Sequence, residues 1–498
     1  MKQRLLSLDM LRGLSIFGMV FSAIIPSGVL PPWMYHIQNP PPTHNLDMAQ
    51  AGITWVDMVF PIFIFCMGVA IPLSGRVKIA AGKSAKEYFK ELFTRFFMLW
   101  GFAYLCVLLN MSSCGGAIAQ LLTLAGFCAL FPLYLQSSKG RAIKWPLRAA
   151  GILLCLLLIF IGERLYGFNI SLGRRSIIIF LMAFLYLFGG AIWYLTRERL
   201  NLRALIFALL LLFTLVTQYL ELPAKTYANP NIRWWFNMEE FYFLLLLLPA
   251  TYVGDLLSGS KAPAEAHAEA HAEVPVQAPV QAPVQAPAET AAQAKGGKGA
   301  LRVLPEGALS LIIMLFCTWT LYFLYKIYRP GFNAALSRES LISLNLLINC
   351  ALLPLMGIGT VRLWPRFKVV FAIAALFLLW GLLMDPLDNG IKKVPCTISY
   401  CFVSFGISAL LLIALNFVAQ IKANPLQRIF AGAGTNPLMS YVAYYILLLP
   451  ILKLTGTMTL LQEITASPLA GVARAALLVL ISMWIVSLFS RKRIFWRA

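Results

Sequence analysis

Long apolar segments recur along the whole chain and constrain its fold more than any other feature. Most are about 20 residues long, the length that an α-helix needs to cross the hydrocarbon core of a bilayer. The alternating segments of about ten residues that mark an outer-membrane barrel are absent from the sequence. The apolar segments fall at residues 10–30, 53–73, 90–110, 115–135, 148–162, 176–195, 203–221, 240–257, 307–328, 340–359, 368–384, 397–419, 437–455 and 470–489. Segment 148–162 is short for a span, so we predict an all-α, polytopic membrane bundle of about 12–14 transmembrane helices.

The composition points to the same class of protein. Apolar residues make up 60% of the chain and charged residues only 12%, whereas soluble domains carry about 25% charged residues. These proportions exclude a cytosolic enzyme, a disordered chain and a secreted disulfide scaffold.

The chain is strongly basic, with 41 Lys and Arg against 20 Asp and Glu and a net charge of +21. The basic residues stand in short loops between apolar segments, where they set topology and contact anionic lipids. Membrane lipids, and not nucleic acid, are therefore the expected partners. Basic clusters follow the second, fourth, sixth and tenth segments and close the chain, so we expect both termini to be cytoplasmic. The pair Arg174 and Arg175 falls on the opposite side in this scheme.

Composition divides the chain into three parts. Residues 258–303 are rich in Ala, Pro, Glu and Gln and repeat V-Q-A-P three times. Such a tract cannot bury an apolar face, so we predict a disordered cytoplasmic linker. It separates an N-terminal transmembrane part, residues 1–257, from a C-terminal one, residues 304–498.

Two histidines and an aspartate mark the loop between the first two segments as a candidate catalytic site. His36 and His44 lie in this Pro- and aromatic-rich loop, and Asp57 lies just inside the second segment. An acid at that depth is costly unless it is paired or faces a polar cavity. A histidine oriented by a carboxylate is a plausible general base. The alternative is that both histidines only hydrogen-bond loop carbonyls, and spacing alone does not choose between them.

Other polar features have simpler interpretations. Asp9 and Arg12 are spaced as a charge pair on one helix face. The nine cysteines contain no C-x-x-C motif and are interpreted as core residues. No phosphate-binding loop, nucleophile elbow or metal-binding motif is present, so no metal is expected.

Four stretches of the sequence resemble one family. They are R-L-L-S-L-D-M-L-R-G (4–13), G-I-T-W-V-D-M-V-F-P-I-F-I-F-C-M-G (52–68), I-K-K-V-P-C-T-I-S-Y (391–400) and G-T-N-P-L-M-S-Y-V (434–442). They are similar, in the same order, to patterns of the heparan-α-glucosaminide N-acetyltransferase family and its bacterial homologues.

The resemblance implies an integral-membrane acyltransferase. Such an enzyme moves an acetyl group from cytoplasmic acetyl-CoA, its co-substrate, to an extracytoplasmic amino sugar or cell-envelope glycan. The family's essential histidine best matches His36, with His44 as the competitor, and its helix acid matches Asp57. The later motifs place Lys393, Ser399, Tyr400 and Asn436 as acceptor-binding candidates. Basic residues near the cytoplasmic loops are candidates for the phosphates of acyl-CoA: Arg4, Arg12, Lys78, Arg95 and Arg428.

The sequence also departs from the family pattern. The W-N-G after the family's histidine is missing, its first-helix asparagine is Ala23, and the Trp before S-x-S-Y is Cys396. These changes leave open the acceptor, the acyl chain and the choice between direct transfer and an acyl-histidine. A transporter or flippase of a glycan or lipid precursor, and a non-catalytic homologue, are the alternatives. The short N-terminus favours a bacterial inner membrane, and homo-oligomer formation is left open.

Overall fold

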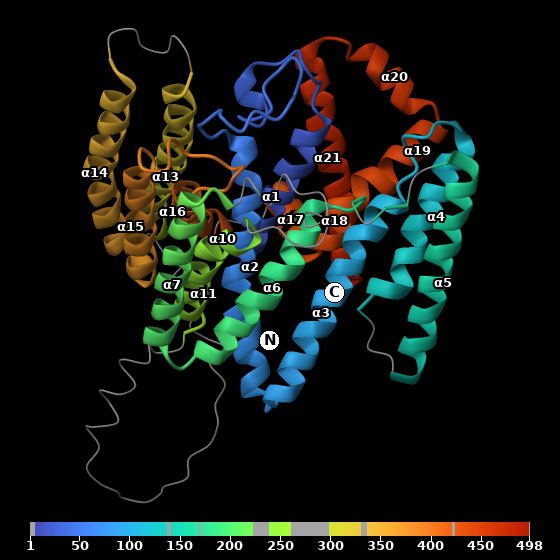
Figure 1. Cartoon of the computed structure of the whole chain (residues 1–498), viewed down its shortest axis with the longest axis horizontal. Helices are drawn as coiled ribbons and strands as arrows, with labels where there is room; N and C mark the ends of the chain where they lie inside the picture. Colours follow the sequence, from blue (N-terminus) through green and yellow to red (C-terminus); the bar gives the residue numbers. More distant parts are fainter. Residues whose placement is uncertain are drawn as a thin grey trace, which may run out of the picture.

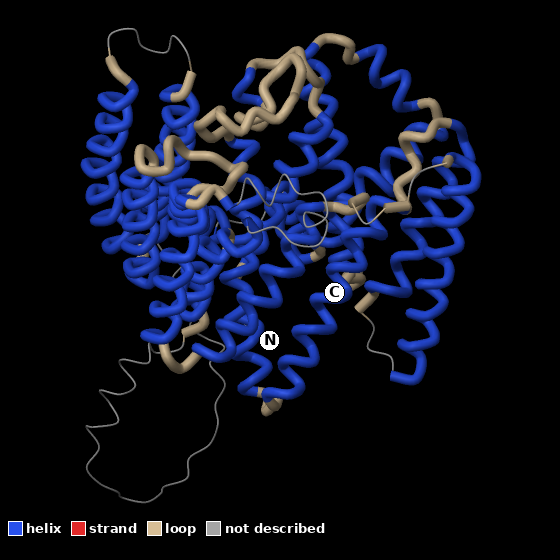
Figure 2. Tube along the Cα trace, viewed as in Figure 1, coloured by secondary structure: helices blue, strands red, loops and turns tan. Residues whose placement is uncertain are grey.

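The structure is a computed structural model that describes residues 5–136, 141–167, 170–171, 173–222, 239–259, 298–329, 336–420 and 424–497. Within these ranges the secondary structure is helical and contains no strand (Figure 2). Thirteen of the described helices are long and apolar enough to cross a membrane. The prediction of an all-α, polytopic membrane bundle is therefore confirmed.

The elements follow one another in the order shown in Figure 1. The longer helices are α1 (Leu6–Ile24), α2 (Trp55–Ala80), α3 (Ala85–Leu108), α4 (Gly116–Tyr134), α5 (Arg141–Tyr166), α6 (Ile177–Thr196), α7 (Leu200–Tyr219), α11 (Leu244–Leu257), α13 (Lys298–Ile327), α14 (Arg338–Leu363), α15 (Lys368–Met384), α16 (Ile398–Gln420), α17 (Pro425–Thr435) and α21 (Pro468–Arg491). The shorter ones are α10 (Glu239–Tyr242), α18 (Pro437–Ala443), α19 (Leu449–Leu454) and α20 (Thr457–Ile464), with a π-helical turn over Tyr444–Leu448 and 3-10 turns over Pro32–Met34 and Pro365–Phe367.

Three predicted boundaries differ from the structure. The short segment 148–162 is the core of a full-length helix, α5. Segment 240–257 is broken at Phe243 into α10 and the 14-residue α11, which is shorter than a bilayer-spanning helix. Helix α13 begins at Lys298, inside the tract assigned to the linker. Residues 260–297 of that tract lie outside the described residues.

Helices α2 and α16 form the centre of the bundle. Of the most apolar 18-residue window, 72% is buried in α2 and 89% in α16. Helix α16 contacts α1, α2, α11, α13 and α15. The Tyr400 hydroxyl, near the start of α16, donates to the carbonyl of Asp57, near the start of α2, over 2.6 Å. The two central helices therefore begin side by side at the same end of the bundle.

One apolar core joins the two predicted transmembrane parts. It contains Leu11 and Phe65 from before the predicted linker together with Phe371 and Phe405 from after it. The two parts are thus packed against each other and do not form two separate cores.

The outer helices present large apolar side chains to their surroundings. Leu153 of α5, Leu212 of α7 and Leu355 of α14 are 68%, 56% and 64% exposed. A water-facing surface of this kind would be strongly unfavourable, whereas it matches the hydrocarbon of a bilayer. The exposed leucines therefore mark the lipid-facing surface.

Helices α1 and α17 cross so closely that glycine is required at the contact. A Cβ atom added to Gly434 would lie 1.8 Å from the carbonyl oxygen of Asp9, and one added to Gly13 would lie 2.1 Å from that of Phe430. Both glycines belong to the motif stretches identified in the sequence. Their role is to let α17 lie against α1, which positions the residues that follow α17.

Replacing Gly434 with Ala should destabilise the bundle, because neither backbone can yield without moving a helix. The expected cost is about 1–3 kcal/mol, measured as a lower Tm of the detergent-solubilised protein. Gly101→Ala is the matched control, because its added Cβ would meet only the Tyr134 hydroxyl, at 3.9 Å. Equal melting temperatures for both variants would contradict this account of the α1–α17 contact.

Candidate functional site at the two ends of helix α2

Asp57 is the most highly connected acid of the candidate site. Its side chain is 2% exposed. Oδ2 accepts hydrogen bonds from the amide and hydroxyl of Thr54 and from the amide of Ile37, at 3.0, 2.9 and 3.1 Å. As the third residue of α2, the carboxylate also lies in the positive field of the helix N-terminus. These contacts hold a buried negative charge without a metal ion.

His36 is oriented by this carboxylate. Its Nδ1 lies 2.8 Å from Oδ1 of Asp57, and its side chain is 39% exposed. A carboxylate only accepts hydrogen bonds, so Nδ1 carries the proton in this pair, and in the neutral imidazole Nε2 is then the nitrogen with the lone pair. This is the arrangement of an oriented general base, in which the acid bonds Nδ1 and leaves Nε2, on the other side of the ring, to react.

His44 has a different role in the same loop. Its Nε2 accepts from the amide of Gly28 at 3.0 Å, and its Nδ1 lies 3.2 Å from the carbonyl oxygen of Asn39. Its ring packs edge-on against Tyr35, with centroids 4.7 Å apart. Both ring nitrogens are thus occupied by backbone groups of the loop. Of the two histidines that the sequence left open, only His36 contacts Asp57.

The loop between α15 and α16, residues 385–397, lies against the α1–α2 loop at the same end of the bundle (Figure 1). The Gln38 side chain bonds both the amide and the carbonyl of Val394. This places Nζ of Lys393 3.4 Å from Nδ1 of His36. The predicted acceptor-binding residue Lys393 therefore lies beside the histidine, where it adds a positive charge.

Ser399 and Tyr400 are fully buried at the start of α16, next to the candidate site. The Ser399 amide donates to Asp388 and its hydroxyl pairs with that of Thr397. The Tyr400 hydroxyl is the group that joins α16 to the Asp57 backbone. Both residues come from a predicted motif, but their polar atoms bond other parts of the protein, so they shape the site without facing it.

Asp385 holds a loop of the candidate site, although its sequence context predicts only an ordinary turn. It is 1% exposed, and its Oδ1 accepts from the Tyr328 hydroxyl at 2.7 Å and from the amide of Ile391 at 2.6 Å. Burial raises the pKa of Asp385 from 3.8 to about 6, although these two hydrogen bonds counteract part of the increase. The acid thereby anchors the loop that carries Lys393. Its position in a Pro- and Gly-containing turn hid this role.

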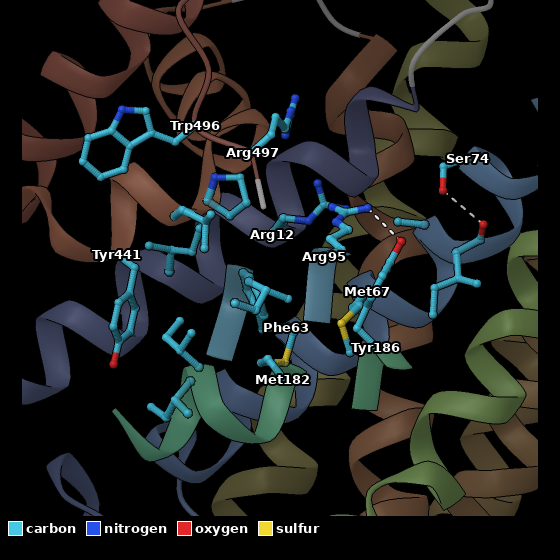
Figure 3. A pocket seen from close by; sticks show the side chains of 18 of the residues that line it. Arg12, Phe63, Met67, Ser74, Arg95, Met182, Tyr186, Tyr441, Trp496 and Arg497 are labelled. Carbon is cyan, nitrogen blue, oxygen red and sulfur yellow. Dashed lines mark hydrogen bonds between the residues drawn. The ribbon is translucent and has the colours of Figure 1, made fainter. Parts of the chain in front are cut away.

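A cavity of about 470 Å³ lies farther along α2, toward its C-terminal end. Its walls come from α1, α2, α3, α6, α18 and the residues after α21. Arg12, Arg95 and Arg497 lie in one part of the cavity in Figure 3, and Phe63, Met67 and Met182 in another. Lys78 and Glu91 also line it. We call this space the basic cavity, since it combines a cationic part with an apolar part.

Three of the predicted phosphate-binding residues line the basic cavity, namely Arg12, Lys78 and Arg95. Arg12 is held by the carbonyl oxygens of Gly434 and Cys66 at 3.2 and 3.5 Å, and by Asp9 at 3.4 Å. The contact with Asp9 is the predicted charge pair. Arg428 is exposed and does not line the cavity, and Arg4 lies outside the described residues.

The His36–Asp57 pair lies at the N-terminal end of α2, and the basic cavity extends along the same helix toward its C-terminal end. Phe63 is six residues from Asp57, or about 9 Å along α2, and Lys78 is 21 residues away, or about 31 Å. Between them, the Ser15 hydroxyl donates to the carbonyl of Val59 at 2.6 Å, which closes α1 onto α2. His36 and the basic cavity are thus separated by a short, tightly packed contact between α1 and α2 around Ser15 and Val59, which we call the seam.

Other polar groups are structural. Asp255 accepts from Nε of Arg76 and from Arg203, both at 2.7 Å, and from the Trp193 indole at 3.3 Å. This buried cluster ties α11 to α2, α6 and α7. In the described part of the chain, no three His, Cys, Asp or Glu side chains are grouped closely enough to hold a metal ion.

The sequence matches the model of a known protein family. The family described as "Domain of unknown function (DUF5009)" matches residues 4–257, which include α1, α2, the histidine and most of the basic cavity. No curated protein matches the chain.

Because folding raises the pKa of Asp385, the folded protein binds its proton more tightly than the unfolded chain. Stability should therefore fall as the pH rises from about 4 to about 6, by about 3 kcal/mol from this residue. Asp385→Asn should remove that part of the pH dependence, measured as the difference in Tm between pH 4.5 and pH 7. Asp47→Asn, at an exposed position, should keep the pH dependence of the wild type. Identical changes of Tm with pH in Asp385→Asn and the wild type would rule out this contribution of Asp385 to stability.

Proposed function

The chain belongs to the DUF5009 family, and we propose that it is a transmembrane acyltransferase. In this proposal it moves an acetyl group from acyl-CoA on the cytoplasmic side to an amino sugar or cell-envelope glycan on the other side. His36 is the catalytic base, oriented by Asp57. The co-substrate acyl-CoA occupies the basic cavity.

The observation that carries the proposal is the pairing of His36 with Asp57. Nδ1 and Oδ1 are 2.8 Å apart, the acid is buried, and the histidine is partly exposed. A purely structural histidine in this loop has the environment of His44, with both nitrogens bonded to backbone. His36 instead has one nitrogen bonded to a buried carboxylate, as acyl-transfer chemistry requires of a base.

The transfer step follows from this geometry. Nε2 of His36 takes the proton of the acceptor amine or hydroxyl while that atom bonds to the thioester carbonyl carbon. The carbon–sulfur bond breaks, and the CoA thiolate leaves and takes up the proton that Nε2 accepted, which returns His36 to its neutral form. Asp57 stabilises the imidazolium formed on the way. If Nε2 attacks the carbonyl carbon itself, the same residues support an acyl-histidine that the acceptor then cleaves.

Lys393 adds a positive charge beside the His36–Asp57 pair. Its ammonium is 3.4 Å from Nδ1 of His36, the ring nitrogen that faces Asp57, so in this proposal it stabilises the charged carboxylate that orients the base. The α15–α16 loop that carries it is held by Gln38 and by Asp385. Acceptor binding and charge stabilisation thus depend on the same loop.

The distribution of charge supports the orientation. Lys78 near the end of α2, Lys83 in the turn that follows and Lys86 at the start of α3 lie together at the C-terminal end of α2, where Lys78 also lines the cavity. Basic residues concentrate on the cytoplasmic side of membrane proteins. We therefore place the basic cavity toward the cytoplasm, His36 toward the opposite side, and the protein in a bacterial inner membrane.

The proposal requires the seam between the two sites to open. The cavity reaches Phe63, about 9 Å along α2 from Asp57. Gly18 faces the side chain of Val59 there, so closely that an added Cβ would lie 2.5 Å from it. An acyl group passing from the cavity to His36 has to separate α1 from α2 at this point, which makes transfer a gated step.

His36→Ala should reduce acetyl-CoA turnover by about 10²–10⁴-fold, the usual contribution of a positioned base. Turnover is measured as release of free CoA thiol by the purified protein with an amino-sugar acceptor. His44→Ala should lower the Tm but retain turnover, since its ring contacts only the loop. Full turnover by His36→Ala would refute the assignment, and a wild-type protein without any acyl-CoA binding would favour a transporter or a non-catalytic homologue.

Arg95→Gln should weaken acetyl-CoA binding about tenfold, because it removes one charge-assisted hydrogen bond to phosphate. Its NH1 group now bonds the Tyr186 hydroxyl at 2.9 Å within the cavity. The control is Arg428→Gln, an exposed cation outside the cavity, which should bind as the wild type does. Equal affinities for both variants in titration calorimetry would exclude the basic cavity as the CoA site.

A further inference from the structure

The residues after α21 fold back against the end of α4. The amide of Arg497 donates to the carbonyl of Tyr134 at 2.7 Å, and the amide of Gln136 donates to the carbonyl of Phe495 at 2.8 Å. Leu135 and Trp496 form an antiparallel bridge between these two backbone contacts. We call residues 494–497 the C-terminal strap.

Asn436 holds the strap from the other side. It is 0% exposed. Its Nδ2 donates to the carbonyl of Ile494 at 3.1 Å, and its Oδ1 accepts from the amide of Trp496 at 3.0 Å. Sequence analysis assigned Asn436 to acceptor binding, but both polar atoms of its side chain bond the strap. Asn436 does not line the basic cavity, so any effect on a ligand there is transmitted through the strap.

An aromatic cluster fixes the strap in the same position. The Trp496 ring is fully buried and packs against Phe127 and Phe131, with centroids 5.2 Å away in each case, and against Phe102 at 6.3 Å. Two side-chain hydrogen bonds and this packing leave the strap little freedom. Its last described residue, Arg497, is thereby presented at the basic cavity.

Arg497 changes the charge balance of that cavity. Lys78 and Glu91 both line it but bond each other, and Glu91 also pairs with Lys83. Arg12 is partly balanced by Asp9. Among the described lining residues, Arg497 is the fourth cation, beside Arg12, Lys78 and Arg95, and Glu91 is the one acid. The Arg497 Nε donates to Oε1 of Gln136 at 3.4 Å, a contact that orients the guanidinium.

We infer that the C-terminal strap is part of the acyl-CoA site, and that Arg497 binds a phosphate of the nucleotide while Asn436 is the positioning residue that holds it there. This inference rests on the function proposed above. A guanidinium is planar and presents paired N–H groups that match phosphate oxygens. The strap provides such a group in the same part of the cavity as Arg12 and Arg95, from a part of the chain that the matched family region does not include.

The test compares a donor with phosphates and one without. Titration of the purified full-length protein with acetyl-CoA should show a Kd about tenfold higher for Arg497→Gln than for the wild type. S-acetyl-pantetheine lacks the nucleotide and its phosphates, so it should bind both proteins equally. Lys492→Gln is the matched control, because Lys492 is an exposed cation near the strap that does not line the cavity.

Asn436→Ala tests the positioning role. It should weaken acetyl-CoA binding as Arg497→Gln does, and the double variant should bind no more weakly than Arg497→Gln alone, because both changes remove the same contact. Unchanged S-acetyl-pantetheine binding in Asn436→Ala shows that the rest of the site is intact.

The outcomes separate this inference from the proposed function. If the wild type binds no acetyl-CoA, the proposed function is wrong. If the wild type binds it and Arg497→Gln binds it equally well, the inference about the strap is overturned and the proposed function stands. Equal losses for both donors would also overturn it, since Arg497 would then act on something other than phosphate.

Discussion

The hydrogen bonds to the Asp57 carboxylate are the constraint on which the rest of the site depends. Removing a carboxylate from water inside a membrane helix is costly unless each oxygen is bonded. Here Thr54, Ile37 and His36 provide those bonds. To do so, the α1–α2 loop has to turn back onto the start of α2. The charge thus determines the conformation of the loop, and the loop presents the histidine.

A second loop completes this arrangement because the two central helices begin at the same end. The Tyr400 hydroxyl bonds the Asp57 carbonyl, and Gln38 bonds Val394 on the α15–α16 loop. These contacts help to bring Lys393 beside His36. The N-terminal and C-terminal halves therefore share one site as well as one core, although about 40 residues that lie outside the described ranges separate them in the sequence.

The basic cavity shows the same dependence on distant segments. The close α1–α17 contact at Gly13 and Gly434 sets the position of Arg12, whose guanidinium bonds the Gly434 carbonyl. The residue two places later, Asn436, holds the C-terminal strap. The motif near residue 434 thus acts through helix packing at Gly434 and through the strap at Asn436, whereas its later residues Pro437, Leu438 and Tyr441 line the cavity directly. The acyltransferase proposal assigns a donor to this cavity and an acceptor to the His36 end, with a closed seam between them.

The sequence by itself determined the membrane class, the helical architecture and nearly all of the spans, and it singled out His36, Asp57 and Arg12 as candidate site residues. The length of an apolar segment is a local property, and Asp57 lies only 21 positions after His36. Both features can therefore be recognised in the sequence. Only the tertiary structure separated His36 from His44, because the difference lies in which partners their ring nitrogens meet. It also brought Asp385 against Tyr328 and placed Arg497 at the basic cavity through the contact with the end of α4. No spacing along the chain encodes these contacts.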